Sequence, residues 1–184
     1  VFIVEVMGHK VGWITLHAGI AGGADIILIP EIPYDIDKVV KKLEERNKKG
    51  KNFSILAVAE GAISKEDAAL PKKELKKKLA QNPSVSYKIG KEIEERLGQE
   101  VRITVPGHTQ RGGSPCPYDR VLSTMFGAEA ARLILNKEFG KMVAMKNNEI
   151  TSVPLEEIAG KLKTIDPECA IIRDAKVLGI GFGD

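Results

Sequence analysis

The chain has 184 residues, of which 43% are hydrophobic and 5% aromatic, a composition that suits one globular domain with a buried core. Its 28 basic and 25 acidic residues give a formal charge of +3 at pH 7, which argues against a protein dedicated to binding nucleic acid. Cys116 and Cys169 lie too far apart for a disulfide framework or a zinc motif, and no membrane-length apolar run or signal-peptide pattern is present, so we expect a cytoplasmic protein.

Short segments rich in Val and Ile alternate with amphipathic segments, a pattern typical of a parallel sheet whose strands are buried on both faces. Strands are expected over residues 1–8, 24–31, 53–61 and 100–107. Helices are expected over residues 12–23, 34–50, 84–98 and 118–137. This order predicts an open three-layer α/β/α sandwich with a mostly parallel sheet and right-handed crossovers.

The remaining segments are less regular. The chain begins with an apolar strand at Val1 and without an initiator methionine; since terminal residues usually fray in water, we expect a piece of a longer protein. The lysine-rich segment 72–83 is predicted to be a mobile excursion. A hairpin around Asn147 and Asn148 and a short helix after Pro154 are expected, while the tail from residue 169 has an ambiguous pattern.

Polar residues follow each predicted strand at its carboxyl end. In open parallel sheets, ligands bind beyond these ends. The four ends carry Met7-Gly8-His9-Lys10, Pro30-Glu31, Glu60-Gly61 and the segment 106–111. We therefore expect two acids and a cluster of cationic or hydrogen-bonding groups to face one crevice.

The segment PGHTQRGGSPCPYDR, residues 106–120, is the most informative of these ends. Arg111 can bind two phosphate oxygens, while His108 and Gln110 can donate to a third. A Gly-Gly pair lets backbone N–H groups approach an anion, and the following helix N-terminus favours the same charge. The alternative is a plain helix-entry turn whose polar side chains satisfy backbone carbonyls.

Other candidate residues have equally ordinary explanations. Glu60 can accept hydrogen bonds from sugar hydroxyls, or it can cap the next helix. Gly8 permits a ligand to approach closely, or it simply makes a tight turn. Trp13 and His17 fall in a predicted buried helix, where packing is the expected role. The lysines of 41–51 and 72–78 are expected to be solvated.

Four segments in this order resemble the 6-phosphofructokinase family. They are VEVMGHKVGWITLHAGIAGGADIILIPE, ILAVAEGA, ITVPGHTQRGGSPCPYDR and KTIDPE. The resemblance covers nearly the whole chain and corresponds to roughly the second half of a family member. The stretch H-T-Q-R-G-G-S-P-x-P-x-D-R carries most of its specificity.

The resemblance implies two similar α/β domains with the active site between them. Residues 1–111 would form the fructose 6-phosphate-binding domain, residues 112–160 would pack toward the phosphate-donor domain, and residues 161–184 would form a C-terminal return segment. The donor domain would lie upstream of residue 1. The implied reaction is phosphoryl transfer from ATP or pyrophosphate to the 1-hydroxyl of fructose 6-phosphate, which gives fructose 1,6-bisphosphate in glycolysis.

The same resemblance implies the roles of individual residues. The implied substrate-binding residues are Met7, Gly8 and His9 along the sugar, Glu60 on its hydroxyls, His108 and Arg111 on the 6-phosphate, and Arg102 on the 6-phosphate of a neighbouring subunit. A shared Arg102 implies a homo-oligomer, a dimer or a tetramer. His9 departs from the family's usual arginine, and Lys10 is a possible replacement. Asp25, Lys49 and Lys51 resemble positions of an effector site in regulated bacterial members.

The implied catalytic base and the aspartates that bind Mg²⁺ belong to segments outside this chain, so no catalytic or metal-binding residue is assigned here. We expect the chain alone to lack kinase activity. The residues do not decide between ATP and pyrophosphate. Two other functions stay open at this point: a non-catalytic sugar-phosphate-binding regulatory module, and a basic nucleic-acid-binding domain that uses the lysine-rich helices.

Overall fold

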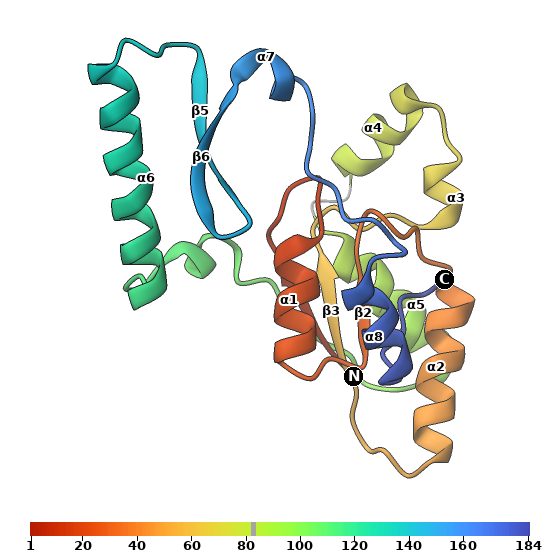
Figure 1. The fold of residues 1–184 in the computed structure, drawn as a ribbon. Helices are drawn as coiled ribbons and strands as arrows, with labels where there is room; N and C mark the ends of the chain where they lie inside the picture. Colours follow the sequence, from red (N-terminus) through yellow and green to blue (C-terminus); the bar gives the residue numbers. More distant parts are fainter. Residues whose placement is uncertain (82–83) are drawn as a thin grey trace. The chain divides into compact units, whose positions relative to one another are not determined.

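The computed structural model describes residues 1–81 and 84–184 and divides the chain into two compact units. Unit 1 comprises Val1–Gln110 and Thr164–Asp184, and unit 2 comprises Arg111–Lys163. The C-terminal segment thus returns to the unit that contains the N-terminus. Each unit has its own set of helices and strands (Figure 1).

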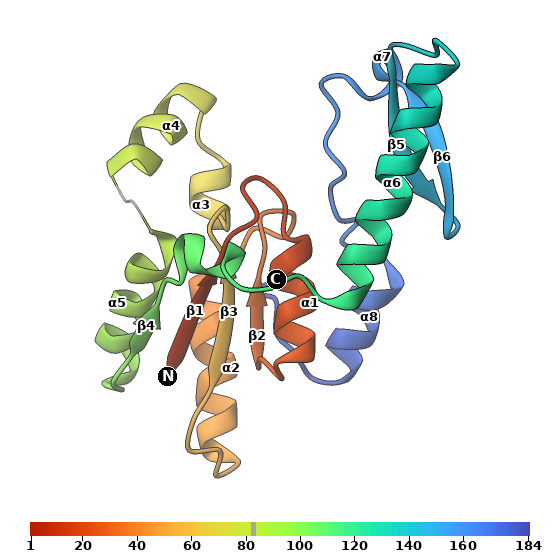
Figure 2. The same ribbon diagram turned by 90° about the vertical axis from the view of Figure 1, so that its left-hand side faces the viewer.

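Unit 1 is built on a four-stranded parallel sheet, as the sequence predicted. Its strands are β1 (Phe2–Val6), β2 (Ile26–Leu28), β3 (Ile55–Ala59) and β4 (Arg102–Thr104). They lie in the order β2-β3-β1-β4, with β1 and β3 side by side at the centre (Figure 2). The predicted segments were longer than the strands because their last residues leave the ladder and form the loops at the sheet edge.

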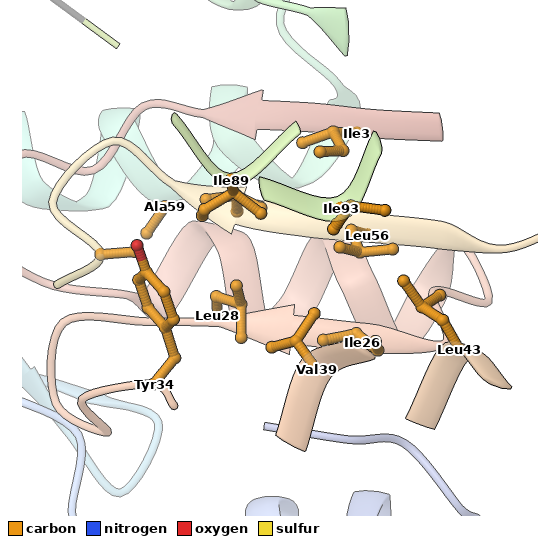
Figure 3. Packing of buried hydrophobic residues seen from close by; sticks show 12 residues of the cluster. Ile3, Ile26, Leu28, Tyr34, Val39, Leu43, Leu56, Ala59, Ile89 and Ile93 are labelled. Carbon is orange, nitrogen blue, oxygen red and sulfur yellow. The ribbon is translucent and has the colours of Figure 1, made fainter. Parts of the chain in front are cut away.

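Helices cover both faces of this sheet, which makes the three predicted layers. The helices of unit 1 are α1 (Trp13–Ala21), α2 (Ile36–Lys48), α3 (Lys65–Ala68), α4 (Lys72–Gln81), α5 (Val85–Leu97) and α8 (Ala170–Val177). Ile26 and Leu28 of β2 belong to the core with α2 and α5, while Ile27 belongs to the core with α1 and α8. Alternate side chains of a strand point to opposite faces, so one short apolar strand serves two cores. Figure 3 shows the α2 and α5 side.

Local capping explains where several helices begin and end. Asp35 precedes α2 and its Oδ1 accepts a hydrogen bond from the Asp37 amide at 2.9 Å. Gly98 ends α5 with φ 61°, a left-handed conformation that glycine adopts without steric cost. The ambiguous tail contains α8, whose Ile172 and Ala175 are buried in the second core.

Two further expectations concern α4 and α1. The segment 72–83 contains the helix α4 over Lys72–Gln81, its mobility stays a prediction, and residues 82–83 lie outside the described residues. Lys, Glu, Leu and Ala favour helix intrinsically, which explains α4. His17 is exposed, and its ring lies 6.0 Å from that of half-buried Trp13 at a tilt of 52°, so the buried packing role predicted for His17 is wrong.

Unit 2 contains a long helix and a hairpin. Its elements are α6 (Pro117–Leu135), β5 (Lys141–Lys146), β6 (Glu149–Pro154) and α7 (Leu155–Ile158). β5 and β6 are antiparallel, and Asn147 and Asn148 between them have φ values of 51° and 64°. Two consecutive positive φ values are the conformation of a tight hairpin turn, as predicted. Among the described residues, no helix combines the length and apolar character that crossing a membrane requires.

Candidate functional site

After β1 and β3, the chain continues to helices on opposite faces of the sheet. β1 leads into α1, whose Leu16 packs on one face, and β3 leads toward α5, whose Ile89 packs on the other. This change of face marks the position where ligands bind in open α/β sheets. Met7–Lys10 follow β1 and Glu60 follows β3 at this point.

Glu60 is bound to the turn that follows β1. Its backbone N–H donates to the Val6 carbonyl at 3.0 Å, which extends the β1–β3 pairing by one residue. Its side-chain Oε1 accepts hydrogen bonds from the amides of Gly8 at 3.1 Å and His9 at 2.5 Å. Because both amides use Oε1, Glu60 can hold this turn and still present Oε2 to a hydroxyl group of a ligand.

The turn itself has little steric freedom. A Cβ on Gly8 would lie 2.6 Å from the Val11 carbonyl oxygen, and one on Gly61 would collide with the His9 carbonyl oxygen. His9 has φ 55°, a left-handed conformation that non-glycine residues rarely adopt. His9 and Lys10 are both exposed. Glycines thus let the two loops approach each other closely, and successive amides point at one carboxylate in the manner of an anion-binding nest.

The segment after β4 reaches the same turn through Gln110. Residues Gly107–Arg111 form the 3₁₀-helix η1, and the Gln110 Oε1 accepts a hydrogen bond from the Met7 amide at 3.0 Å. His108 is exposed in η1. Arg111 is also exposed; it is the first residue of unit 2. Unit 1 therefore brings together Met7, Gly8, His9 and Glu60 with Gln110.

Arg102 lies at the opposite end of the sheet from this turn. It is the first residue of β4 and pairs with Phe2, the first residue of β1. Its side chain is 67% exposed and forms an ion pair with Glu100 at 3.0 Å. Arg102 also lines a cavity of about 460 Å³ together with Val1 and Phe53. The structure thus does not bring Arg102 into the group around Glu60.

Glu31 was noted as a strand-end acid, but its partners were not foreseen. Its Oε1 and Oε2 each lie 3.1 Å from the amide nitrogen of Gly12, which precedes α1. Its Oε1 also accepts from the Ile165 amide at 3.2 Å, a residue 134 positions away along the chain. Glu31 therefore anchors the C-terminal return segment to the start of α1. The strand-end position was the only signal for it in the sequence.

A second charged group, which the sequence pattern did not predict, lies near Glu60. Asp67 of α3 is buried and forms ion pairs with Lys78 at 2.5 Å and with Lys88 at 3.0 Å. Burial alone would raise the pKa of Asp67, but hydrogen bonds from the two lysines outweigh it and lower that pKa below its ordinary value. These residues and Glu60 line a cavity of about 360 Å³.

Asp25, Lys49 and Lys51, which resemble an effector site, lie around the carboxyl end of α2. Asp25 accepts a hydrogen bond from the Ile55 amide at 2.9 Å and forms an ion pair with Arg46 at 2.8 Å. Asp25 and Lys51 line a cavity of about 470 Å³, and Lys49 is the exposed residue that follows α2. Asp25 is thus already engaged by a cation of its own unit.

Metal ligands form no cluster in the part of the chain that the structure describes. Within residues 1–81 and 84–184, no group of three or more His, Cys, Asp or Glu side chains could hold a metal ion. We assign no residue of this chain to the metal.

Comparison with known proteins gives matches over the whole chain. The profile of the family described as Phosphofructokinase matches residues 1–134. An ATP-dependent 6-phosphofructokinase of Spirochaeta thermophila is 50% identical over 186 aligned positions, which cover 100% of this chain and 51% of that enzyme. The chain thus spans about half the length of this relative.

Solved structures agree with this match. The Pichia pastoris phosphofructokinase in the T-state superposes with a TM-score of 0.64 and 37% identity, over 85% of this chain and 17% of that one. A pyrophosphate-dependent phosphofructokinase of Nitrosospira multiformis has a TM-score of 0.73 over 100% of this chain and 48% of that one; at 19% identity it shows a common fold alone. The profile match and the sequence identity together show that this chain belongs to the phosphofructokinase family.

Proposed function

We propose that this chain is the fructose 6-phosphate-binding half of a 6-phosphofructokinase, which converts that sugar phosphate to fructose 1,6-bisphosphate in glycolysis. The observation that carries the proposal is the convergence of Glu60 with the Met7–His9 turn at the carboxyl ends of the two central strands. In an open parallel sheet this is where a ligand binds. Membership of the phosphofructokinase family supports fructose 6-phosphate as the ligand.

In this proposal each residue has a role that its chemistry can perform. Glu60 accepts hydrogen bonds from sugar hydroxyls, and Met7, Gly8 and His9 line the sugar. His108 and Arg111 hold the 6-phosphate, which the guanidinium group can bind through two parallel hydrogen bonds. These groups bind and orient the acceptor so that its 1-hydroxyl faces the donor, and such positioning supplies much of the acceleration in phosphoryl transfer.

The transfer itself needs groups outside this chain. A bond forms between the sugar O1 and the transferred phosphorus, the bond from that phosphorus to the leaving oxygen of the donor breaks, and the 1-hydroxyl proton passes to an upstream base. Mg²⁺ held by upstream residues supplies charge neutralisation at the phosphates. We propose ATP as the donor, because the relative with 50% identity is named for it.

The proposal extends to the assembly of the enzyme. Residues 112–160 pack toward a donor domain that lies upstream of residue 1, and residues 161–184 return to the sugar-binding domain. Arg102 reaches the 6-phosphate bound in a neighbouring subunit of a cytoplasmic homo-oligomer. Its place at the amino end of β4, away from Glu60, fits a residue that serves another subunit's site.

Arg111→Ala in the full-length enzyme tests the 6-phosphate contact. A charge-assisted hydrogen bond contributes about 1.5–3 kcal/mol, so the dissociation constant of fructose 6-phosphate should rise about 10- to 150-fold by isothermal calorimetry. Arg132→Ala is a matched control, because Arg132 is exposed on α6 and pairs with Glu129. An affinity unchanged by Arg111→Ala would remove Arg111 from the site.

A coupled activity assay tests the division between binding and chemistry. The 184-residue chain should show no turnover with either donor, whereas the full-length enzyme should use ATP in preference to pyrophosphate. Turnover by the chain alone would contradict the assignment of the base to an upstream segment. Binding of fructose 6-phosphate without turnover in the full-length protein would favour a non-catalytic regulatory module instead.

A further inference from the structure

Three consecutive backbone amides of the turn after β1 donate to only two side chains. The Met7 amide donates to Gln110 at 3.0 Å, and the Gly8 and His9 amides donate to Glu60 at 3.1 and 2.5 Å. Gln110 is 103 positions from Met7, and Glu60 is more than 50 positions from either of its donors. The turn is therefore held from the ends of two other strands, β3 and β4.

Such restraints stabilise the turn because one of its residues has an unfavourable backbone conformation. His9 has φ 55°, which costs a non-glycine residue on the order of 1–2 kcal/mol relative to ordinary torsions. Next to His9, the Val11 amide donates to the Gly8 carbonyl at 3.2 Å, and Gly61 lies close to the His9 carbonyl oxygen. The hydrogen bonds to Gln110 and Glu60 act on the amide side of the same three residues.

Gln110 differs from Glu60 because it belongs to the segment that follows β4. Its Oε1 accepts from Met7, so its Nε2 group is the part of the side chain left to donate elsewhere. The sequence pattern alone suggested that Gln110 donates to a phosphate oxygen. The structure gives its oxygen a partner in the protein, and the donation by Nε2 stays a prediction. Through this bond η1, which carries His108, is tied to the backbone of the Met7–His9 turn.

We propose that Gln110 is a positioning residue, which fixes the Met7–His9 turn relative to η1 so that the sugar-facing turn and His108 act as one binding surface. The proposal rests on the proposed function, because it assumes that this surface binds fructose 6-phosphate. Gln110 acts through the Met7 backbone, so removing its acceptor should loosen the turn while the sheet stays intact.

Amide hydrogen exchange of the 184-residue chain, followed by NMR, tests the positioning role without any ligand. Gln110→Leu keeps the size of the side chain and removes the acceptor, so exchange at Met7 should become about 2- to 10-fold faster. Gln110→Glu keeps an acceptor oxygen and should restore the slower exchange. Glu60→Ala should instead speed exchange at Gly8 and His9 first.

Gln99→Leu is the matched control. Gln99 precedes β4 and lines the cavity near Val1, whereas Gln110 follows β4, so this variant changes a glutamine at the other end of the strand. It should leave the exchange of Met7, Gly8 and His9 unchanged. Unchanged Met7 exchange in Gln110→Leu would overturn the proposal. Equally faster exchange at Ile27 in the sheet would also overturn it, because the effect would then be a general loss of stability.

Binding supplies the second readout. In the full-length enzyme Gln110→Leu should raise the dissociation constant of fructose 6-phosphate about 2- to 10-fold. Faster Met7 exchange with an unchanged dissociation constant would overturn the link between the turn and the sugar site. If the unsubstituted enzyme binds no fructose 6-phosphate, the proposed function fails, and the exchange pattern by itself still decides whether Gln110 holds the turn.

Discussion

The two units of the chain differ in how much apolar surface each buries within itself. Unit 1 has a core on each face of its sheet, and Ile3, Leu16, Ile26, Ile27 and Leu56 are fully buried. In unit 2, all of whose residues are described, Leu133 is the only buried hydrophobic residue. Folding requires buried apolar area to offset lost chain entropy. Unit 1 buries apolar side chains on both faces of its sheet, whereas unit 2 buries little apolar surface.

Unit 2 exposes several large apolar side chains on its long helix α6. The large exposed apolar residues on α6 are Tyr118, Val121, Met125, Ile134 and Leu135. Extended exposed apolar surfaces usually mark interfaces. In the proposed function these side chains of α6 would pack against the donor domain. The comparison therefore separates a unit with a core on each face of its sheet from a unit with little buried apolar surface.

The largest expected effect comes from deleting apolar volume in unit 1. Leu56→Ala removes a fully buried side chain and should lower the free energy of unfolding by about 2–5 kcal/mol. Leu135→Ala in unit 2, where the side chain is 80% exposed, should change it by less than about 0.5 kcal/mol. Urea unfolding followed by fluorescence measures the change in unit 1, because the only tryptophan, Trp13, packs against a unit 1 core, and amide exchange in α6 measures the change in unit 2.

Equal effects of the two substitutions would contradict the comparison. That result would mean that Leu135 contributes to a core of the isolated chain as much as Leu56 does. Leu79→Ala is a further control, because Leu79 belongs to unit 1 but is 49% exposed. A small effect of Leu79→Ala would show that burial, and not membership of unit 1, sets the cost.

Replacing a glycine by alanine should change stability in opposite directions in the two units. Gly61→Ala places a Cβ against the His9 carbonyl oxygen and should destabilise unit 1 by about 1–3 kcal/mol. Gly127→Ala lies in the middle of α6 with no atom within 4 Å of the new Cβ, and should stabilise that helix by about 0.5–1 kcal/mol. Urea unfolding reports the first change, and amide exchange in α6 reports the second. A neutral Gly61→Ala would show that the two loops have room to separate.

Sequence periodicity predicted most of unit 1 because its strands are short apolar segments, and β2 and β3 each contribute side chains to two cores. A run such as Ile26–Leu28 is apolar at every position, which only a doubly covered strand requires. The strand-end rule also placed Glu60 and the Met7–His9 turn at one edge of the sheet. It could not predict that Glu60 binds the Gly8 and His9 amides, since this depends on the left-handed torsion of His9.

Contacts between distant segments were beyond the sequence pattern. Glu31 binds the amide of Ile165, 134 positions away, and no local signal connects the two residues. Asp67 looked like one of many charges in a mixed segment, but folding buries it between Lys78 and Lys88. Helix α8 was not predicted because its eight residues are too few to establish a period within the tail. Such features follow from tertiary packing, which one-dimensional periodicity does not encode.

The smallest expected effect is a difference in pH dependence between Asp67 of unit 1 and Glu138 of unit 2. Lysine hydrogen bonds lower the pKa of Asp67 despite its burial, so its contribution to stability is present above its unfolded pKa and is lost as pH falls through the lower folded pKa. The hydrogen bond from Lys141 also lowers the pKa of Glu138, but that carboxylate is 39% exposed and water screens the pair.

Urea unfolding between pH 6 and pH 3, about the range over which carboxylates titrate, separates the two groups. Asp67→Asn should flatten the loss of unit 1 stability on the acid side, because the substituted chain has no carboxylate to protonate between Lys78 and Lys88. Glu138→Gln should leave the curve close to that of the parent chain. If Glu138→Gln flattens the curve as much as Asp67→Asn, exposure does not distinguish the ion pairs of the two units, and the contrast between them would then rest on apolar burial alone.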